Sequence, residues 1–255
     1  MELKGKAAIV TGSSSGVGRA TALRLARKGC SVLINYSSKR AEAEKVSEEV
    51  KALGVQSVVV QADVANDADC RKLADTAVKT FGRLDVLVNN AGTTRFIDWN
   101  DLDAVQTEDW DRIFGVNVRG AFQCARAARK ALEASGHGAI VNVSSTASLR
   151  PFGSSIPYCA SKGALNNLTL TLARTLAPKI RVNAVAPGFI AGDWLQAGLG
   201  AAYEIAKKHA ESKNPLQRVS EPDDIAAAIL ALIEGGDMVT GHILPVEGGV
   251  LFTQG

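Results

Sequence analysis

The chain has 255 residues, of which 46% are apolar and 22% are charged, and its formal net charge at pH 7 is only +3. This composition is that of an ordinary globular protein and excludes the disordered and fibrous classes. No stretch approaches the roughly 18 to 20 uncharged apolar residues of a membrane span, the basic residues are too dispersed for a nucleic-acid surface, and the 4 cysteines are scattered without a Cys-x-x-Cys pair. We therefore expect a soluble cytoplasmic protein that binds no metal ion, no membrane and no nucleic acid.

Short apolar runs alternate along the chain with longer segments of helical period. The apolar runs predict strands at residues 7–11, 31–36, 57–62, 84–89, 139–144, 181–186 and 243–246. The helical period predicts helices at residues 18–28, 39–53, 65–80, 107–134, 156–176 and 222–233. Strands rich in valine and isoleucine without polar alternation are buried on both faces, which favours a parallel sheet between two helix layers. The predicted fold class is α/β, a doubly wound parallel sheet of about seven strands in a single domain, residues 1–255.

The first predicted strand runs into the sequence TGSSSGVGRA at residues 11–20, directly before a helix. Gly12, Gly16 and Gly18 let the backbone turn tightly and approach a pyrophosphate. The amides and the partial positive charge at the start of the following helix attract the phosphates. The loop therefore predicts a dinucleotide site.

The same loop also matches Gly-x-Ser-x-Gly, with Ser14 as the nucleophile of a serine hydrolase. Such an enzyme needs a later aspartate and histidine, and the chain offers only His137, His209 and His242. None of the three has a convincing setting, and Gly18 has no role in a hydrolase. A hydrolase remains an alternative from another class, whereas a P-loop is excluded because no Lys-Ser or Lys-Thr follows the glycines.

Five motifs follow one another in a fixed order: TGSSSGVG at residue 11, NNAG at 89, NVSS at 142, YCASK at 158 and APG at 186. Together they resemble the short-chain dehydrogenase/reductase family of the Tyr-x-x-x-Lys type, over about residues 3–249. The resemblance implies a Rossmann-like fold, a nicotinamide cofactor and hydride transfer between a carbonyl and an alcohol. Within the family, the segment VLINYSSKRAEAEKV resembles the 3-oxoacyl-acyl-carrier-protein reductases, although Gly136 stands where these often have a basic residue.

Tyr158 and Lys162 lie four residues apart, on one face of a predicted helix. Hydride transfer to a carbonyl leaves an alkoxide, which needs a proton donor within hydrogen-bond reach. The Lys162 ammonium should lower the pKa of the Tyr158 phenol and make the two side chains one acid–base unit. By resemblance, Ser145 hydrogen-bonds the substrate oxygen and Asn117 supports a water relay behind Lys162. A buried amide that merely satisfies its own hydrogen bonds is the alternative for Asn117.

A nicotinamide dinucleotide with an adenosine 2′-phosphate fits the end of the second predicted strand. NAD sites place a carboxylate there, about 20 residues beyond the glycines, whereas this chain has Tyr36, Ser37, Ser38, Lys39 and Arg40. Hydroxyl donors with a cation suit a phosphate dianion, so we predict NADP(H), with NAD as the alternative. The alternative is that Lys39 and Arg40 merely open a solvated helix.

The resemblance extends the cofactor site to further residues at strand ends. Asp63 is similar to a family residue that contacts the adenine amino group, with a strand-end cap as the alternative, and Gly192 replaces a frequent threonine near the carboxamide. The predicted cofactor-binding residues are Gly12, Ser14, Gly16, Val17, Gly18, Tyr36, Ser37, Ser38, Lys39, Asp63, Val64, Asn90, Ala91, Gly92, Tyr158, Lys162, Pro187, Gly188 and Ile190.

The substrate is a small molecule with a carbonyl or alcohol, and Ser145, Phe152 and Trp194 are the predicted substrate residues. A segment near 189–214 interrupts the strand–helix alternation and predicts a lid over the carboxyl ends of the strands. The family's four-helix contact implies a homotetramer through the segments 107–134 and 156–176. A cofactor-binding regulator without turnover is a third hypothesis, which the intact set Asn117, Ser145, Tyr158 and Lys162 argues against.

Overall fold

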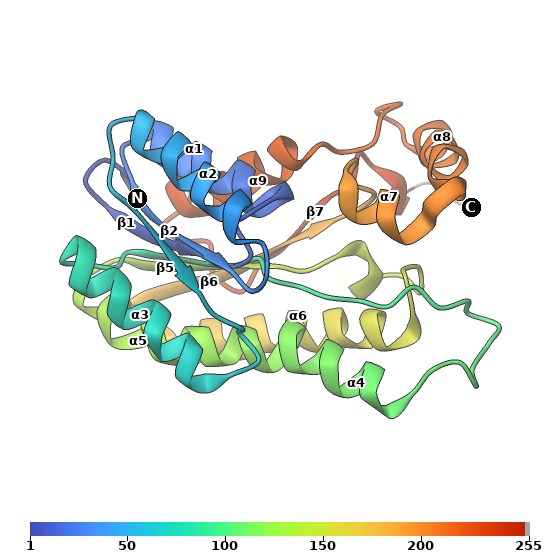
Figure 1. The fold of residues 1–255 in the computed structure, drawn as a ribbon, viewed down its shortest axis with the longest axis horizontal. Helices are drawn as coiled ribbons and strands as arrows, with labels where there is room; N and C mark the ends of the chain where they lie inside the picture. The colour runs from blue at the N-terminus through green and yellow to red at the C-terminus, as the bar shows by residue number, and fades with distance from the viewer. Residues whose placement is uncertain (253–255) are drawn as a thin grey trace.

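The computed structural model describes residues 1–252, which form one seven-stranded parallel sheet between two layers of helices (Figure 1). The strands lie in the order β3-β2-β1-β4-β5-β6-β7. Their bounds are β1 (Ala7–Val10), β2 (Ser31–Tyr36), β3 (Ser57–Gln61), β4 (Val86–Asn89), β5 (Gly138–Val143), β6 (Ile180–Pro187) and β7 (Ile243–Val246). The predicted fold class and all seven predicted strands are confirmed.

The inner strands β1 and β4 bury both of their faces, which explains why they lack polar alternation, whereas the outer strands β3 and β7 are only partly buried. On β1, Ala8 and Val10 pack into the core on one side of the sheet and Ile9 packs into the core on the other side. The first side is covered by α1 (Gly16–Arg27), α2 (Arg40–Ala52) and α9 (Pro222–Glu234). The second side is covered by α3 (Asp67–Phe81), α5 (Ala121–Ala134) and α6 (Ile156–Leu176). Among the described residues, no helix has the length and apolar character of a membrane span.

The prediction of a single continuous helix at residues 107–134 is wrong in one respect, because the observed helix is interrupted. It consists of α4 (Thr107–Phe114), a π-helical turn η1 (Gly115–Gly120) and α5. The interruption lies where the helix approaches the loop after β3: a Cβ added at Gly120 would lie 2.8 Å from Cγ2 of Val64. Single π turns within α-helices are frequent at functional sites, and this one carries Asn117.

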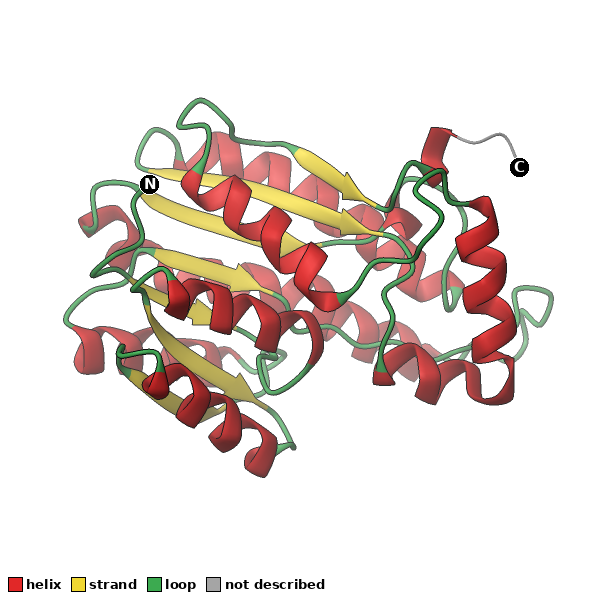
Figure 2. Ribbon diagram, turned by 90° about the horizontal axis from the view of Figure 1, so that it is seen from above, coloured by secondary structure: helices red, strands yellow, loops and turns green. Residues whose placement is uncertain are grey.

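The carboxyl ends of the strands gather the predicted site at one edge of the sheet. The strand order reverses between β1 and β4, and in such sheets ligands bind at that point. The predicted lid lies at the same end of the molecule, as α7 (Asp193–Leu199), the short turn η3 (Gly200–Ala202) and α8 (Tyr203–Lys213) (Figures 1 and 2). Two further 3₁₀ turns, η2 (Thr146–Ser148) and η4 (Val250–Phe252), complete the described elements.

Candidate active site

The glycine loop after β1 packs tightly on the loop after β4. A Cβ added at Gly18 would lie 2.5 Å from the carbonyl oxygen of Gly12 and 2.6 Å from Nδ2 of Asn90. Gly12 has a φ of +61°, and a Cβ there would lie 3.0 Å from Cα of Ala91. Only glycine therefore fits at these two positions, and the structure brings Gly12, Gly18, Asn90 and Ala91 together as predicted.

The start of α1 suits a phosphate group. Its N-cap residue Ser15 makes no side-chain capping bond among the described residues, and its first turn contains no acidic residue. The helices α3, α4 and α9 each have acidic residues in the first turn. A Cβ added at Gly16 would meet nothing within 4 Å. Free amides, absent carboxylates and open space fit the pyrophosphate of a dinucleotide.

Two polar residues that hold this loop escaped the sequence analysis. Oδ1 of the buried Asn35 accepts a hydrogen bond of 2.9 Å from the amide of Gly12, and its Nδ2 donates one of 3.0 Å to the carbonyl of Ala62. Oγ1 of Thr11 accepts bonds of 3.0 Å from the amides of Asn90 and Ala91. An asparagine inside the otherwise apolar run of β2 was the available signal, because a buried amide must find partners.

The hydrolase alternative fails on topology. Ser14 follows β1 at the carboxyl edge of the sheet, whereas His137 precedes β5 and His242 precedes β7, both at the opposite edge. His209 is exposed on α8. Neither His137 nor His242 can reach Ser14, so no Ser-His arrangement forms around it.

Tyr158, Ser145 and Lys162 meet beyond the end of β5. The Ser145 hydroxyl lies close enough to Tyr158 to act on the pKa of its phenol, and Nζ of Lys162 lies 5.5 Å from the centre of the Tyr158 ring. Nζ also donates a bond of 2.9 Å to the carbonyl of Val143. Tyr158 is 7% and Lys162 is 4% exposed. The predicted phenol, ammonium and serine hydroxyl thus occupy one buried site.

The expected lowering of the Tyr158 pKa is wrong for this structure. Burial raises the pKa of Tyr158 to about 12, although the hydrogen bond from Ser145 opposes the shift. Burial also lowers the pKa of Lys162 to about 8. The physical reason is that removal from water disfavours both charged forms, while the Lys162 ammonium bonds to the carbonyl of Val143 and lies over the ring.

Asn117 bonds across the site to neighbouring segments. Nδ2 of Asn117 donates bonds of 3.0 Å to Oγ of Ser161 and to the carbonyl of Thr93. The amide of Thr93 in turn donates a bond of 2.8 Å to Oδ1 of Asn117. A Cβ added at Gly92 would lie 3.6 Å from Oδ1 of Asn117 and 3.7 Å from Nζ of Lys162. Asn117 and Lys162 therefore approach one point, although protein groups already satisfy the Asn117 amide.

A small cavity adjoins Asn117. Its lining includes Thr11, Asn89 and Leu165, and Oδ1 of Asn89 is buried and finds no hydrogen-bond partner among the described residues. Buried polar atoms in such cavities commonly bind an ordered water molecule.

The segment after β3, which holds Asp63 and Val64, is fastened to α3 and α5. Oδ1 of Asp63 accepts a bond of 2.9 Å from the amide of Ala65, and Arg112 of α4 donates one of 3.0 Å to its Oδ2. Partial burial favours the neutral acid, but these two bonds hold the pKa of Asp63 below its usual range. The strand-end cap considered from the sequence is therefore present, whereas a contact of Asp63 with adenine stays a prediction.

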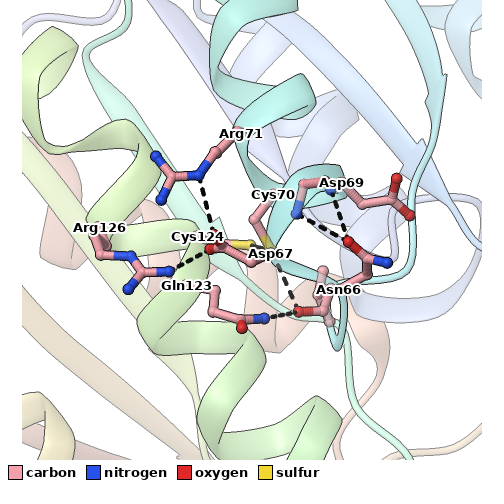
Figure 3. A network of polar contacts seen from close by, with 10 residues as sticks. Asn66, Asp67, Asp69, Cys70, Arg71, Gln123, Cys124 and Arg126 are labelled. Carbon is pink, nitrogen blue, oxygen red and sulfur yellow. Dashed lines mark hydrogen bonds and ion pairs between the residues drawn. The ribbon is translucent and has the colours of Figure 1, made fainter.

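Val64 receives two side-chain hydrogen bonds, which belong to a network between α3 and α5 (Figure 3). Its carbonyl accepts bonds of 3.2 Å from Sγ of Cys70 and 2.9 Å from Nε2 of Gln123. The Cys70 and Cys124 sulfurs lie 3.5 Å apart, and Asp67 pairs with Arg126 of α5. The backbone beside Asp63 is thus held rigidly.

The end of β2 contains no carboxylate. Tyr36 is buried, whereas Ser37, Ser38 and Lys39 are exposed. Arg40 forms an ion pair of 2.7 Å with Glu44 on its own helix. Lys39 is therefore the cation of this segment that is available to a 2′-phosphate.

The end of β6 presents backbone groups beside the site. Phe189 and Ala191 both bond to the backbone of Ser220, so the amide and carbonyl of Ile190 between them point the other way. Gly188 packs against Glu247, since a Cβ there would lie 2.8 Å from that of Glu247. A structural reason for glycine instead of the family's frequent threonine at position 192 is the backbone: φ of Gly192 is +145°, which strains a residue with a side chain.

The predicted substrate residues Trp194 and Phe152 lie near Tyr158 in different ways. The Trp194 ring centre is 6.1 Å from that of Tyr158. Phe152 precedes Gly153, at which an added Cβ would lie 3.4 Å from Cδ1 of Tyr158. The lid and the loop before α6 therefore both border the phenol.

Comparison with known proteins agrees with this arrangement. A family model described as enoyl-(acyl carrier protein) reductase matches residues 12–251. A Streptomyces violaceoruber protein described as ketoacyl reductase 2 of the granaticin polyketide synthase is 45% identical, over 95% of this chain and 94% of its own. The 3-oxoacyl-[acyl-carrier-protein] reductase FabG of Staphylococcus aureus is 38% identical, over 96% of this chain and 98% of its own.

Solved structures show the same fold. A chain from Burkholderia xenovorans, assigned as a short-chain dehydrogenase/reductase, has a TM-score of 0.90 at 40% identity and covers 97% of this chain and 98% of its own. An NAD⁺-bound xylitol dehydrogenase has a TM-score of 0.88 at 30% identity and covers 98% of this chain and 100% of its own. The chain belongs to the short-chain dehydrogenase/reductase family. It is therefore an oxidoreductase of a family that binds a nicotinamide cofactor.

Proposed function

We propose that the protein is an NADP(H)-dependent oxidoreductase that interconverts a carbonyl and a secondary alcohol, with Tyr158 as general acid and base. The observation that carries the proposal is that the Tyr158 phenol, the Lys162 ammonium and the Ser145 hydroxyl share one buried site. A nicotinamide held by the glycine loop and the end of β6 would supply the hydride for the carbonyl carbon, or accept it in the reverse direction. Tyr158 donates its proton to the oxygen that becomes the alcohol, and it removes that proton in the reverse direction.

The other residues of the site prepare this proton transfer. Ser145 donates a hydrogen bond to the substrate oxygen and holds it near the phenol. Lys162 stabilises the phenolate that remains after proton donation. A water molecule in the cavity at Asn89 and Asn117 would carry the proton onward, which is the relay that the family resemblance implies.

The preference for NADP(H) is supported by the end of β2, where exposed Ser37, Ser38 and Lys39 replace a carboxylate. The residues named above for the glycine loop, the loop after β4 and the end of β6 would hold the rest of the cofactor. The proposal also includes a cytoplasmic location and a homotetramer, both of which rest on the family resemblance.

A more specific candidate is a 3-oxoacyl-acyl-carrier-protein reductase. The relatives described as ketoacyl and 3-oxoacyl reductases favour it. Gly136 does not count strongly against it, because its φ is +86° and it lies in the turn between α5 and β5, at the sheet edge opposite the site. Glycine is favoured at this position because the turn requires a positive φ.

The experiment is a comparison of NADPH and NADH oxidation by the purified full chain, with acetoacetyl-CoA and a panel of small ketones. We expect turnover with a higher kcat/KM for NADPH than for NADH, and a smaller ratio in Lys39→Ala. Arg40→Ala is the matched control, because the Arg40 guanidinium is already paired with Glu44.

Three results would contradict parts of the proposal. A preference for NADH contradicts the NADP(H) assignment. Turnover of other ketones without acetoacetyl-CoA removes the acyl reductase candidate. Cofactor binding without turnover of any carbonyl supports the regulator instead.

A further inference from the structure

An aromatic cluster borders the catalytic phenol. Aromatic residues form only 5% of the chain, yet Phe96, Trp99, Phe152 and Trp194 all lie on segments that contact Tyr158 or its immediate neighbours. Phe152 is 78% and Trp194 is 51% exposed. Exposed apolar side chains that gather in one place mark binding surfaces.

Trp194 forms one side of this cluster. Its ring is tilted by 57° to that of Tyr158 at a centre distance of 6.1 Å. The phenol is nearly buried while half of the indole stays exposed. The open part of the Trp194 side chain is therefore exposed apolar surface next to the Tyr158 ring.

Phe96 and Gly198 hold Trp194 in this place. The Phe96 ring meets Trp194 edge to face, with a centre distance of 6.4 Å and an angle of 68°. A Cβ added at Gly198 would lie only 2.0 Å from Cε2 of Phe96, so the phenyl ring occupies the space of the missing side chain. The loop after β4 is thereby packed onto the lid helix α7.

Phe152 lies on a second segment beside the phenol, directly before Gly153. The segment that follows it is tied to the loop after β4 by a bond of 2.9 Å from the Trp99 indole to the carbonyl of Gly153, and by one of 2.9 Å from the amide of Ile97 to the carbonyl of Ser154. The guanidinium of Arg95 on the same loop is paired with Asp109 at 2.8 Å. On this segment, Phe152 offers an exposed aromatic side chain.

We propose that Trp194 and Phe152, with Trp194 braced by Phe96 on Gly198, select carbonyl substrates that carry an aromatic ring close to the reacting carbonyl. The inference rests on the proposed carbonyl reductase function and names its substrate class. A flat ring can stack on the exposed indole and phenyl surfaces, and such aromatic pairs stabilise a complex beyond their buried area. An aliphatic chain of equal size gains only the burial.

The test compares benzylacetone with its cyclohexyl analogue, which has the same carbonyl environment and a similar size. We expect kcat/KM with NADPH to favour benzylacetone by about tenfold, the upper range for one aromatic pair. The ratio should fall to about one in Trp194→Leu and persist in Trp194→Phe. Trp110→Leu is the matched control, since Trp110 is 38% exposed on α4 and should leave the ratio unchanged.

The brace is tested by Gly198→Ala, which must displace Phe96 and should lower the ratio. Gly163→Ala is its control, because a Cβ there meets nothing within 4 Å. Equal kcat/KM for both ketones in the wild-type enzyme overturns the inference. So does a ratio that Trp194→Leu leaves unchanged.

A binding measurement separates this inference from the proposed function. Saturation-transfer NMR on Tyr158→Phe, which should not turn over, is expected to show the benzylacetone ring in contact with the protein and to lose this signal in the double variant with Trp194→Leu. Ring contacts without wild-type turnover of any ketone would contradict the proposed function and support the aromatic site. Normal turnover without ring contacts would overturn the aromatic site alone.

Discussion

The Tyr158 phenol lies near the Ser145 hydroxyl, and the Lys162 ammonium lies over its ring. Tyr158→Phe keeps the ring and removes only the proton donor. We expect kcat to fall by about 10²- to 10⁴-fold, the usual contribution of general acid catalysis, while the Kd for NADPH stays near the wild-type value. Steady-state kinetics and calorimetric titration measure the two quantities.

The control is Tyr203→Phe, which removes a lid hydroxyl that accepts a bond of 3.3 Å from the amide of Gly192. It should keep most of the wild-type kcat. A Tyr158→Phe enzyme with wild-type kcat would show that another group supplies the proton.

The buried Lys162 gives a prediction about stability and pH. Its pKa falls from 10.5 to about 8 on folding because burial disfavours the ammonium. Between these two values the unfolded chain binds more protons at this residue than the folded chain, so the contribution of Lys162 to stability increases from pH 8 to 10.5. Urea unfolding of the protein without added cofactor should show the free energy of unfolding of wild type rising relative to Lys162→Met over this range.

Parallel pH curves for the two proteins would contradict this prediction. The comparison with Lys162→Met is needed because Tyr158 acts in the opposite sense: its pKa is raised from 10.0 to about 12, so its contribution to stability is lost as the pH rises through that range. The difference between the curves isolates the lysine.

Residue identities could be predicted at this scale, but their environments could not. The spacing of Tyr158 and Lys162 and the serine before them indicated the site, and the structure brings all three together. The direction of the Tyr158 pKa shift was wrong, because depth of burial depends on the packing of Trp194 and other distant residues. Asn35 was missed because its partners Gly12 and Ala62 lie on other segments.

Among the elements, α3 begins with an N-cap residue, Asn66, whose side chain accepts hydrogen bonds from two backbone amides of the first turn. Oδ1 of Asn66 accepts bonds of 2.9 Å from the amide of Ala68 and 3.4 Å from that of Asp69. Asn66→Ala should lower the free energy of unfolding by about 1 kcal/mol. Asn167→Ala, at an exposed position within α6, should change it by less than about 0.5 kcal/mol.

Chemical denaturation of both variants measures this difference. Equal free energies of unfolding for Asn66→Ala and Asn167→Ala would show that the cap contributes nothing to stability. A change in NADPH affinity in Asn66→Ala alone would in addition link the cap to the segment at Asp63 and Val64, which the same helix supports.

The helices and strands could be predicted from the period of the apolar residues, but the interruptions within them could not. The segment 107–134 has a continuous helical period, so this pattern could not predict the π turn at Gly115–Gly120. The turn results from close packing of Gly120 on Val64, which comes from another part of the chain. The segment between 189 and 214 was recognised as a break in the alternation, although its two helices were not separated, and its role as a lid stays a prediction.

At the scale of the whole molecule, apolar side chains remain exposed on the outer surface of α4, α5 and α6. Trp110, Phe122 and Leu170 are 38%, 40% and 47% exposed, and Phe122 borders a surface hollow together with Phe114 and Leu168. These are the segments through which the predicted homotetramer would assemble. Light scattering should give the mass of four chains for the wild type and a smaller assembly for Phe122→Glu, because burial of a carboxylate in this apolar contact carries a desolvation cost.

The control is Leu53→Glu, at a residue that is 41% exposed at the end of α2 and outside these segments. It should leave the mass unchanged. A monomeric mass for the wild type contradicts the tetramer.

The strand order also determines how a growing chain can assemble on the ribosome. β1 lies between β2 and β4, yet β4 begins only at Val86, after β2, β3 and three helices have been made. Until Val86–Asn89 leaves the exit tunnel, the apolar strand β1, which lies inside the finished sheet, has an open edge. Unpaired edges of this kind recruit other chains, so translation that pauses before β4 would expose the nascent protein to aggregation and to capture by chaperones.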